Sequence, residues 1–160
     1  MKSFFEKWKP YASWILLTEA VGAAAGLLTR RAVRVYNETV LKPPLSPPPV
    51  VFPIAWALLY ALMGAGMARV WLTPDSETRE KSLRWFLIQL AFNFCWSLIF
   101  FNRRAYGASL AWLAALWAEI LIMTLLFRRA DKTAALLQLP YLAWVLFAFY
   151  LNLGVWLLNG

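Results

Sequence analysis

The amino-acid sequence predicts an all-α membrane protein, a bundle of five transmembrane helices that forms a single domain over residues 1–160. The chain is 62% hydrophobic and 15% charged, and a soluble domain of this length could not bury so much apolar surface. The apolar residues gather into five continuous runs, each long enough to cross a bilayer. Because the runs lack the short alternating pattern of a membrane barrel, we expect helices.

The first run covers about Tyr11–Leu28. Its basic start is similar to a signal peptide, but no small-residue cleavage site follows and Glu19 interrupts the run, so we interpret it as a retained helix. The spacing Gly22-Ala-Ala-Ala-Gly26 favours close approach of another helix, for tight packing or dimerisation. We expect a long loop, Thr29–Pro49, to follow, since its LKPPLSPPP stretch cannot be helical and should lie extended over a helix end.

The remaining runs cover about Val50–Leu72, Trp85–Phe101, Ala105–Phe127 and Thr133–Leu158. The charged link Thr73–Arg84 offers Thr73 or Ser76 as a helix N-cap. The last two links are so short that the third, fourth and fifth helices should pack as antiparallel neighbours. Ten basic residues fall on the side of the N-terminus and six on the other side, which predicts a cytoplasmic N-terminus.

The composition also excludes several kinds of site. The chain has no histidine, and Cys95 is its one cysteine. An intramolecular disulfide, a cysteine metal cluster, a histidine-ligated haem and a Ser-His-Asp triad are therefore excluded, and we expect no metal and no cofactor. The net charge is +8, but the basic residues lie between apolar runs. This placement indicates anchors beside lipid headgroups and not a nucleic-acid surface.

Three helices carry stripes that combine large aromatic side chains with polar or small ones, because residues four and seven apart share a helix face. The stripes are Trp56, Tyr60, Met63 and Met67; Gln89, Asn93, Trp96 and Phe100; and Trp144, Ala148 and Asn152. Tryptophans this far inside a run either pack helices together or line a cavity, and each indole N–H needs a partner when buried. The asparagines suit interhelical hydrogen bonds or ligand contacts.

Two carboxylates, Glu19 and Glu119, lie nearer the middle of their runs than the ends. A charged side chain at the bilayer centre costs about 2.5–3.5 kcal/mol. The two side chains are therefore protonated, paired with an arginine, or directed into a wet cavity, and the sequence leaves these alternatives open.

Three stretches carry a resemblance to a known family: KPPLSPPPVVFPIAWALLYALMG, FNFCWSLIFFNRR and DKTAALLQLPYLAWVLFAFYLNLGVW. In this order they resemble the TspO/MBR family, which comprises the tryptophan-rich sensory proteins of bacteria and the translocator protein (peripheral benzodiazepine receptor) of animal mitochondria. The resemblance implies a five-helix bundle, commonly a homodimer, with a pocket closed by the first loop. Family members bind porphyrins, and animal members bind cholesterol and benzodiazepine-type drugs.

Matched residue by residue, the resemblance implies two sets of site residues. The ligand-binding set is Trp56, Tyr60, Asn93, Trp96, Trp144, Ala148 and Asn152, and the lid loop contributes Lys42, Pro43, Pro44, Leu45, Pro47 and Pro48. The chain also departs from the family. Leu45 replaces a frequent aromatic residue and Pro49 a usual glycine. No basic residue follows Tyr150, so the animal cholesterol motif is absent.

Three functions stay open. The leading interpretation is a membrane ligand-binding or sensory protein of translocator type in a bacterial cytoplasmic membrane, which binds a porphyrin-like hydrophobic ligand such as protoporphyrin IX. The second is a light- or oxygen-dependent porphyrin-degrading enzyme, as some bacterial members are reported to be, acting through Trp56 and Trp144. The third is a proton-coupled transporter of small molecules that uses Glu19, as small multidrug antiporters use a membrane carboxylate.

Overall fold

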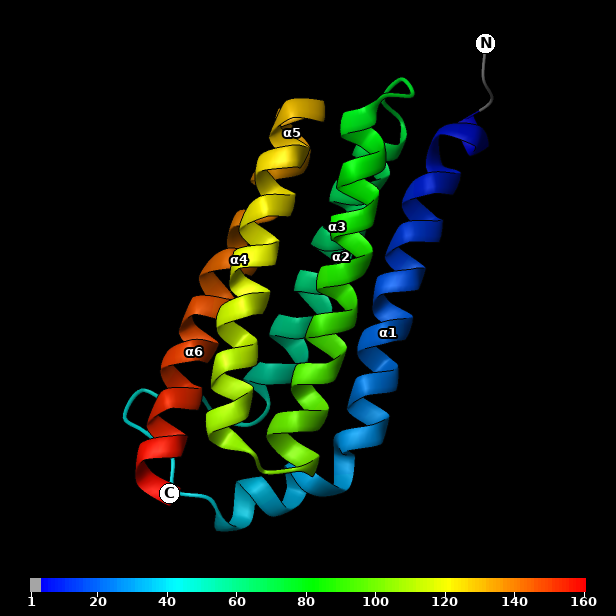
Figure 1. The fold of residues 1–160 in the computed structure, drawn as a ribbon. Helices are drawn as coiled ribbons and strands as arrows, with labels where there is room; N and C mark the ends of the chain where they lie inside the picture. The colour runs from blue at the N-terminus through cyan, green and yellow to red at the C-terminus, as the bar shows by residue number, and fades with distance from the viewer. Residues whose placement is uncertain (1–3) are drawn as a thin grey trace.

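The structure is a computed structural model that describes residues 4–160, with side chains from residue 5 onward. Within these residues, five helical spans are long and apolar enough to cross a membrane, and no residue is in a β-strand. The predicted fold class is therefore confirmed, and the protein is an integral membrane protein. Figure 1 shows the spans side by side as one bundle, with the start of α1 at the upper end and the C-terminus at the lower end.

The helices follow one another with short connections, apart from the one after the first helix. In order they are α1 (Phe4–Thr39), α2 (Val51–Trp71), α3 (Glu77–Ser97), a π-helical turn η1 (Leu98–Asn102), α4 (Tyr106–Ala130), α5 (Lys132–Leu136) and α6 (Leu139–Asn159). The closest pairs are α1 with α2, α3 with α4, and α4 with α6. The last two pairs match the antiparallel neighbours expected from the short links.

The predicted end of the first helix, at Leu28, is wrong. Helix α1 continues to Thr39, because residues 30–39 contain neither glycine nor proline and place Val33 and Tyr36 at helical spacing. The predicted loop of residues 29–49 is thereby reduced to residues 40–50. Figure 1 shows that the last part of α1 turns aside and crosses the lower end of the bundle. Within α1, the Thr29 hydroxyl donates to the Ala25 carbonyl at 2.8 Å, a type of contact that often bends helices.

The predicted bounds of two other helices also differ from those in the structure. Helix α3 begins at Glu77 and not at Trp85, because Ser76 accepts a hydrogen bond from the Arg79 N–H and caps the helix. Glu77 then suits the positive end of the helix dipole. The fifth run divides into α5 and α6 because Pro140 is tolerated only in the first turn of a helix.

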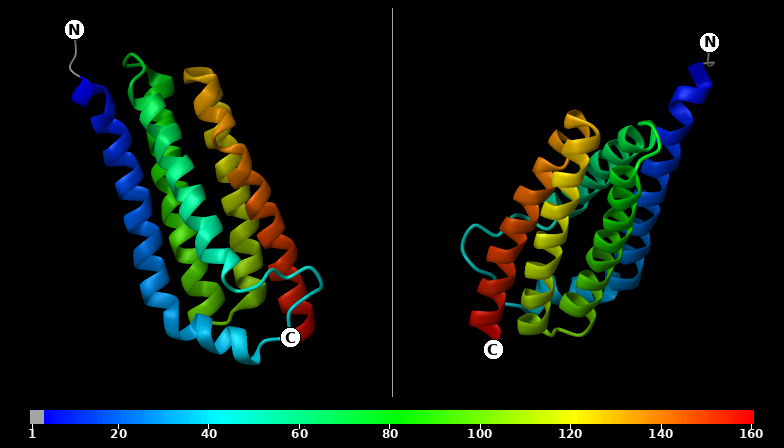
Figure 2. Two further views of the ribbon diagram at one scale, coloured as in Figure 1. Left: turned by 180° about the vertical axis from the view of Figure 1, so that it is seen from behind. Right: turned by 45° about the horizontal axis from the view of Figure 1, so that its top comes forward.

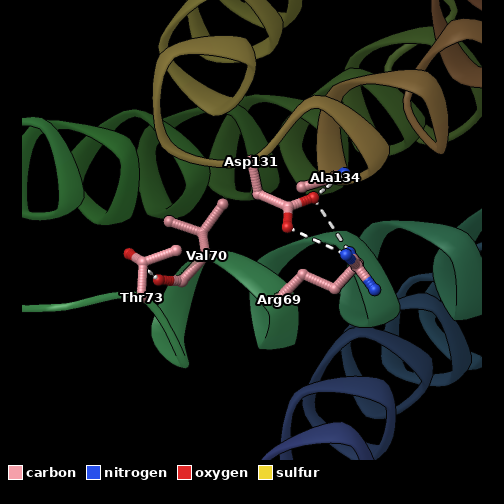
Figure 3. Close-up of polar contacts among 5 residues, drawn as sticks. All are labelled: Arg69, Val70, Thr73, Asp131 and Ala134. Atoms are coloured by element: carbon pink, nitrogen blue, oxygen red, sulfur yellow. Dashed lines mark hydrogen bonds and ion pairs between the residues drawn. The ribbon is translucent and has the colours of Figure 1, made fainter.

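An ion pair between Asp131 and Arg69 joins the α4–α5 link to α2 at the upper end of the bundle, and we call it the Asp131 clip. Asp131, in the α4–α5 link, accepts hydrogen bonds from Arg69 Nε and Nη2, each at 2.9 Å, and from the Ala134 N–H at 2.7 Å. Figure 3 shows the Asp131 carboxylate between these donors, with the Thr73–Val70 hydrogen bond beside it. The Arg69 guanidinium, helped by the Ala134 N–H, lowers the pKa of Asp131 from its usual value of 3.8.

The connection after α1 lies along α6. Asn159 pairs with the backbone of Leu41 through two hydrogen bonds of 3.1 and 2.9 Å, and the Tyr150 hydroxyl donates to the Pro44 carbonyl at 2.7 Å. Pro43 packs against Gly154, where a Cβ would leave no room for the proline ring. Figure 2 shows this segment looping beside the C-terminal half of α6.

Candidate ligand-binding site

A cavity of about 600 Å³ lies in the half of the bundle toward the bend of α1. Its walls come from α1, the N-terminal part of α2, the end of α3 with η1, and α6. A pocket of this size between helices is typical of small-molecule sites in bundles. The sequence had placed such a site on helices two, three and five, and the structure adds α1 as a fourth wall.

One side of the cavity is aromatic. Trp56 lies at its centre, with its ring centroid 5.6 Å from that of Tyr60 and 6.5 Å from those of Trp96 and Trp144. Trp96 is buried and its indole donates to Asn152 Oδ1 at 3.2 Å. Trp56 and Trp144 are half-buried, and neither indole N–H has a hydrogen-bond partner among residues 5–160. Both N–H groups are thus unused by the described part of the protein, and both residues line the cavity.

The facing side is a smooth strip of α1. Gly22, Ala23 and Gly26 line the cavity there, with Glu19 before them and Arg30 after them. A Cβ at Gly26 would meet nothing within 4 Å, so this part of the strip leaves room for a planar ring. Gly22 packs directly on the Tyr60 ring, so the small residues predicted to promote helix packing or dimerisation here serve contact with α2 and the cavity of the same chain.

The polar residues of the stripes form a network behind the aromatic wall. The Tyr60 hydroxyl donates to Asn93 Oδ1 at 2.7 Å, the Asn93 amide donates to the Tyr141 hydroxyl at 2.7 Å, and Tyr141 donates to Gln89 Oε1 at 2.9 Å. Asn93 is 1% exposed and does not line the cavity. Its place is behind Tyr60, where it fixes the direction of the phenol.

Asn152 does reach the cavity, as do Ala148 and Tyr60. Oδ1 of Asn152 accepts from Trp96 Nε1 and the Ser109 hydroxyl, while its amide donates one hydrogen bond to the Tyr106 carbonyl. Asn152 therefore orients Trp96, and its carbonyl oxygen is already used by neighbouring helices.

The residues expected to form the lid lie elsewhere. None of Lys42, Pro43, Pro44, Leu45, Pro47 and Pro48 lines the cavity, whereas Pro49 does. Leu45 is 82% exposed and has a φ of 65°, a left-handed conformation that is unusual for a branched side chain. Lys42 donates to the Asn37 carbonyl and lies over the Tyr36 ring. The cavity end is covered by the bent part of α1 instead of by the proline stretch.

Three lining residues of α1, Val33, Tyr36 and Asn37, are not predicted by the sequence, and Arg30 was expected mainly as a lipid anchor. All four line the cavity, and Tyr36 packs on Phe100 and Phe101 with centroid distances of 5.5 and 5.3 Å. They were assigned to a loop because arginines interrupt the apolar run. Their continued spacing of three and four residues after Gly26 is the signal that could have placed them on the same helix face.

Comparison with known proteins finds one family that matches most of the chain. The model of the TspO/MBR family matches residues 14–157. A tryptophan-rich protein TspO from Chlorobaculum tepidum is 38% identical over 88% of this chain and 89% of its own length, and one from Archaeoglobus fulgidus is 37% identical over 91% and 94%. A translocator protein from Bos taurus is 30% identical over 93% and 89%.

Proposed function

The chain belongs to the TspO/MBR family, and on that premise we propose that it binds a porphyrin-like hydrophobic ligand, such as protoporphyrin IX, in the cavity between α1, α2 and α6. Membership makes it a membrane protein of sensory or translocator type. The observation that carries the proposal is the cavity of about 600 Å³ with tryptophans on one side and small residues on the other. A flat apolar ring fits between two such surfaces.

Each wall of the cavity has a role in this proposal. Trp56, Trp96 and Trp144 stack on the ring or meet its edge, and the free indole N–H groups of Trp56 and Trp144 offer hydrogen bonds to acceptors on the ligand. Tyr60 and Ala148 complete the aromatic side, and Asn93 and Asn152 hold Tyr60 and Trp96 in place.

Arg30 supplies a cation at the far end of the α1 strip. Among residues 5–160 it is the one basic residue that lines the cavity. A guanidinium forms strong hydrogen bonds with carboxylates, so Arg30 is suited to meet an acidic side arm of the ligand, such as a porphyrin propionate. Arg31 and Arg34 do not line the cavity and are left to face lipid headgroups.

The proposal is tested by tryptophan fluorescence quenching on titration of protoporphyrin IX into the protein in lipid nanodiscs. We expect saturable quenching in the wild type and an affinity about tenfold lower in Trp144→Phe, since an aromatic contact and an N–H donor are worth roughly 1–2 kcal/mol together. Trp156→Phe is the matched control, because it lies on the same helix outside the cavity. Quenching that never saturates, or equal loss in both variants, would contradict the proposal.

The homodimer, the bacterial cytoplasmic membrane and the cytoplasmic N-terminus belong to the same proposal. They follow from the family resemblance and from the distribution of basic residues. Light scattering of the detergent-solubilised protein, corrected for bound detergent, would give twice the mass of an 18.3 kDa chain if the dimer forms.

A further inference from the structure

One lining residue, Glu19, has no role in the proposed binding of a planar ring. Glu19 lines the cavity near the middle of α1, in a segment that crosses the membrane. Among residues 5–160 it is the one carboxylate in the lining. A membrane carboxylate normally has a partner or lines a functional pathway, because an isolated charge there is costly.

Glu19 has no partner within the described chain: no hydrogen bond or ion pair engages its carboxylate among residues 5–160. The cation on the same strip, Arg30, is eleven residues further along. At 1.5 Å per residue the two backbones are roughly 16 Å apart along a straight helix, which is too far for an ion pair. The carboxylate is therefore presented to the cavity without compensation.

Tyr60 lines the same cavity as Glu19 and has a second acceptor oxygen. The Tyr60 ring packs on Gly22, which is three residues after Glu19 and on the same helix face, and Thr18 holds the two helices together by donating to the Tyr60 carbonyl at 2.7 Å. The hydroxyl hydrogen of Tyr60 is committed to Asn93, whose own amide is committed to Tyr141. The phenol oxygen can therefore only accept a further hydrogen bond.

We propose that Glu19 and Tyr60 form a recognition site for a ligand nitrogen that donates a hydrogen bond or carries a proton, on a planar aromatic ring held in the cavity. The Glu19 carboxylate and the Tyr60 phenol oxygen both accept hydrogen bonds, so they select a donor on the ligand. The partner would also compensate the Glu19 carboxylate in the membrane. This inference rests on the ligand cavity of the proposed function and assigns its polar specificity.

A pair of probes with the same ring system tests the assignment. The cation of 9-aminoacridine and neutral acridine are both planar and differ in the protonated, N–H-bearing group. Binding of each is measured at pH 7 by saturable quenching in phosphatidylcholine nanodiscs, after subtraction of partitioning into empty nanodiscs. We expect the wild type to bind the aminoacridine cation at least tenfold more tightly than acridine.

Three variants test whether Glu19 causes the preference for the aminoacridine cation. Glu19→Gln should abolish most of the preference by weakening aminoacridine binding while acridine affinity stays within about twofold. Glu119→Gln removes a carboxylate near the middle of α4, which lies outside the cavity lining, and should keep the wild-type preference. Trp144→Phe should weaken both probes by a similar factor.

The outcomes separate this inference from the proposed function. A wild type without the preference, or a Glu19→Gln variant that keeps it, overturns the role of Glu19. Loss of the preference in Glu119→Gln as well would show a general effect of membrane charge and would also overturn it. If neither probe saturates in the wild type, or if Trp144→Phe changes neither affinity, the ligand cavity itself is refuted.

Discussion

Asn93 illustrates how a hydrogen-bond partner decides the role of a single buried residue. It joins Tyr60 of α2 to Tyr141 of α6 and is almost completely buried. Sequence alone gave it two roles, a link between helices or a ligand contact. The geometry places it one layer behind the cavity, where its effect on a ligand passes through Tyr60.

Replacing Asn93 with leucine should destabilise the bundle by about 1–3 kcal/mol, because the Tyr60 hydroxyl loses its acceptor and Tyr141 loses a donor. Thermal unfolding in detergent, followed by circular dichroism, measures the change. Asn102→Leu is the control, since Asn102 makes one exposed hydrogen bond of 3.3 Å to Leu28 and should cost less than about 0.5 kcal/mol. An Asn93→Leu variant as stable as the wild type would show that the network adds nothing.

The Asp131 clip makes a pH-dependent prediction. Its pKa is lowered by the Arg69 hydrogen bonds and by the Ala134 N–H, so the stabilisation is complete above the usual pKa of about 4 and is lost as pH falls through the lowered value. Both side chains are partly exposed, and Asp131→Asn should therefore cost only about 1 kcal/mol at pH 7.

Comparison of two variants separates the ion pair from the helix cap. Asparagine keeps an N-cap oxygen, whereas Asp131→Ala loses both contacts and should cost roughly 2 kcal/mol at pH 7. The difference in melting temperature between wild type and Asp131→Asn should shrink as the pH is lowered from 7 to 3. A difference that stays constant over this range would mean that the Arg69 pair does not stabilise the fold.

At the scale of helices, the α1–α2 contact depends on small residues. A Cβ at Gly64 would meet the backbone of Ile15, while a Cβ at Gly26 would meet nothing within 4 Å. Backbone atoms cannot move aside as the end of a side chain can. The two glycines lie in helix interiors and share the same intrinsic cost relative to alanine, so they form a matched pair.

We expect Gly64→Ala to lower the stability of the detergent-solubilised protein by about 1–3 kcal/mol, because α1 must shift away from α2. Gly26→Ala should leave stability unchanged or raise it by up to about 1 kcal/mol. The melting temperatures of both variants give the comparison. Equal effects of the two substitutions would contradict the close approach of α1 and α2.

At the scale of the whole molecule, the two ends of the bundle differ in charge and in structure. Figure 1 places the bend of α1, the α3–α4 link and the C-terminus at the lower end, and the α2–α3 link and α5 at the upper end. The basic residues counted along the sequence favour the upper end as the cytoplasmic one.

Cysteine labelling in a Cys95→Ser background checks this orientation. Leu45→Cys tests the lower end and Asp75→Cys the upper end, and the side chains they replace are 82% and 94% exposed. In intact spheroplasts a membrane-impermeant maleimide should label the Leu45→Cys variant and reach Asp75→Cys only after permeabilisation. The opposite pattern would place the N-terminus outside.

The sequence by itself determined the five spans, the family and the aromatic side of the cavity. Run length and helical spacing are local properties, so the stripes through Trp56, Trp96 and Trp144 could be located on their helices without any knowledge of packing. The same locality explains the errors. A bent helix and a loop look alike when arginines interrupt an apolar run, so residues 30–39 were assigned to the wrong class of structure.

Only the tertiary structure decided which face of α1 meets the cavity, that Asn93 stands behind Tyr60, and that the proline segment lies along α6. In a bilayer, lipid and a neighbouring helix are equally apolar, so hydropathy does not reveal which side of a helix is buried in protein. Close packing at Gly22 and Gly64 and the hydrogen bonds of Tyr60, Asn93 and Tyr150 make that choice. These contacts join residues far apart in the chain, and their partners appear only when the helices are assembled.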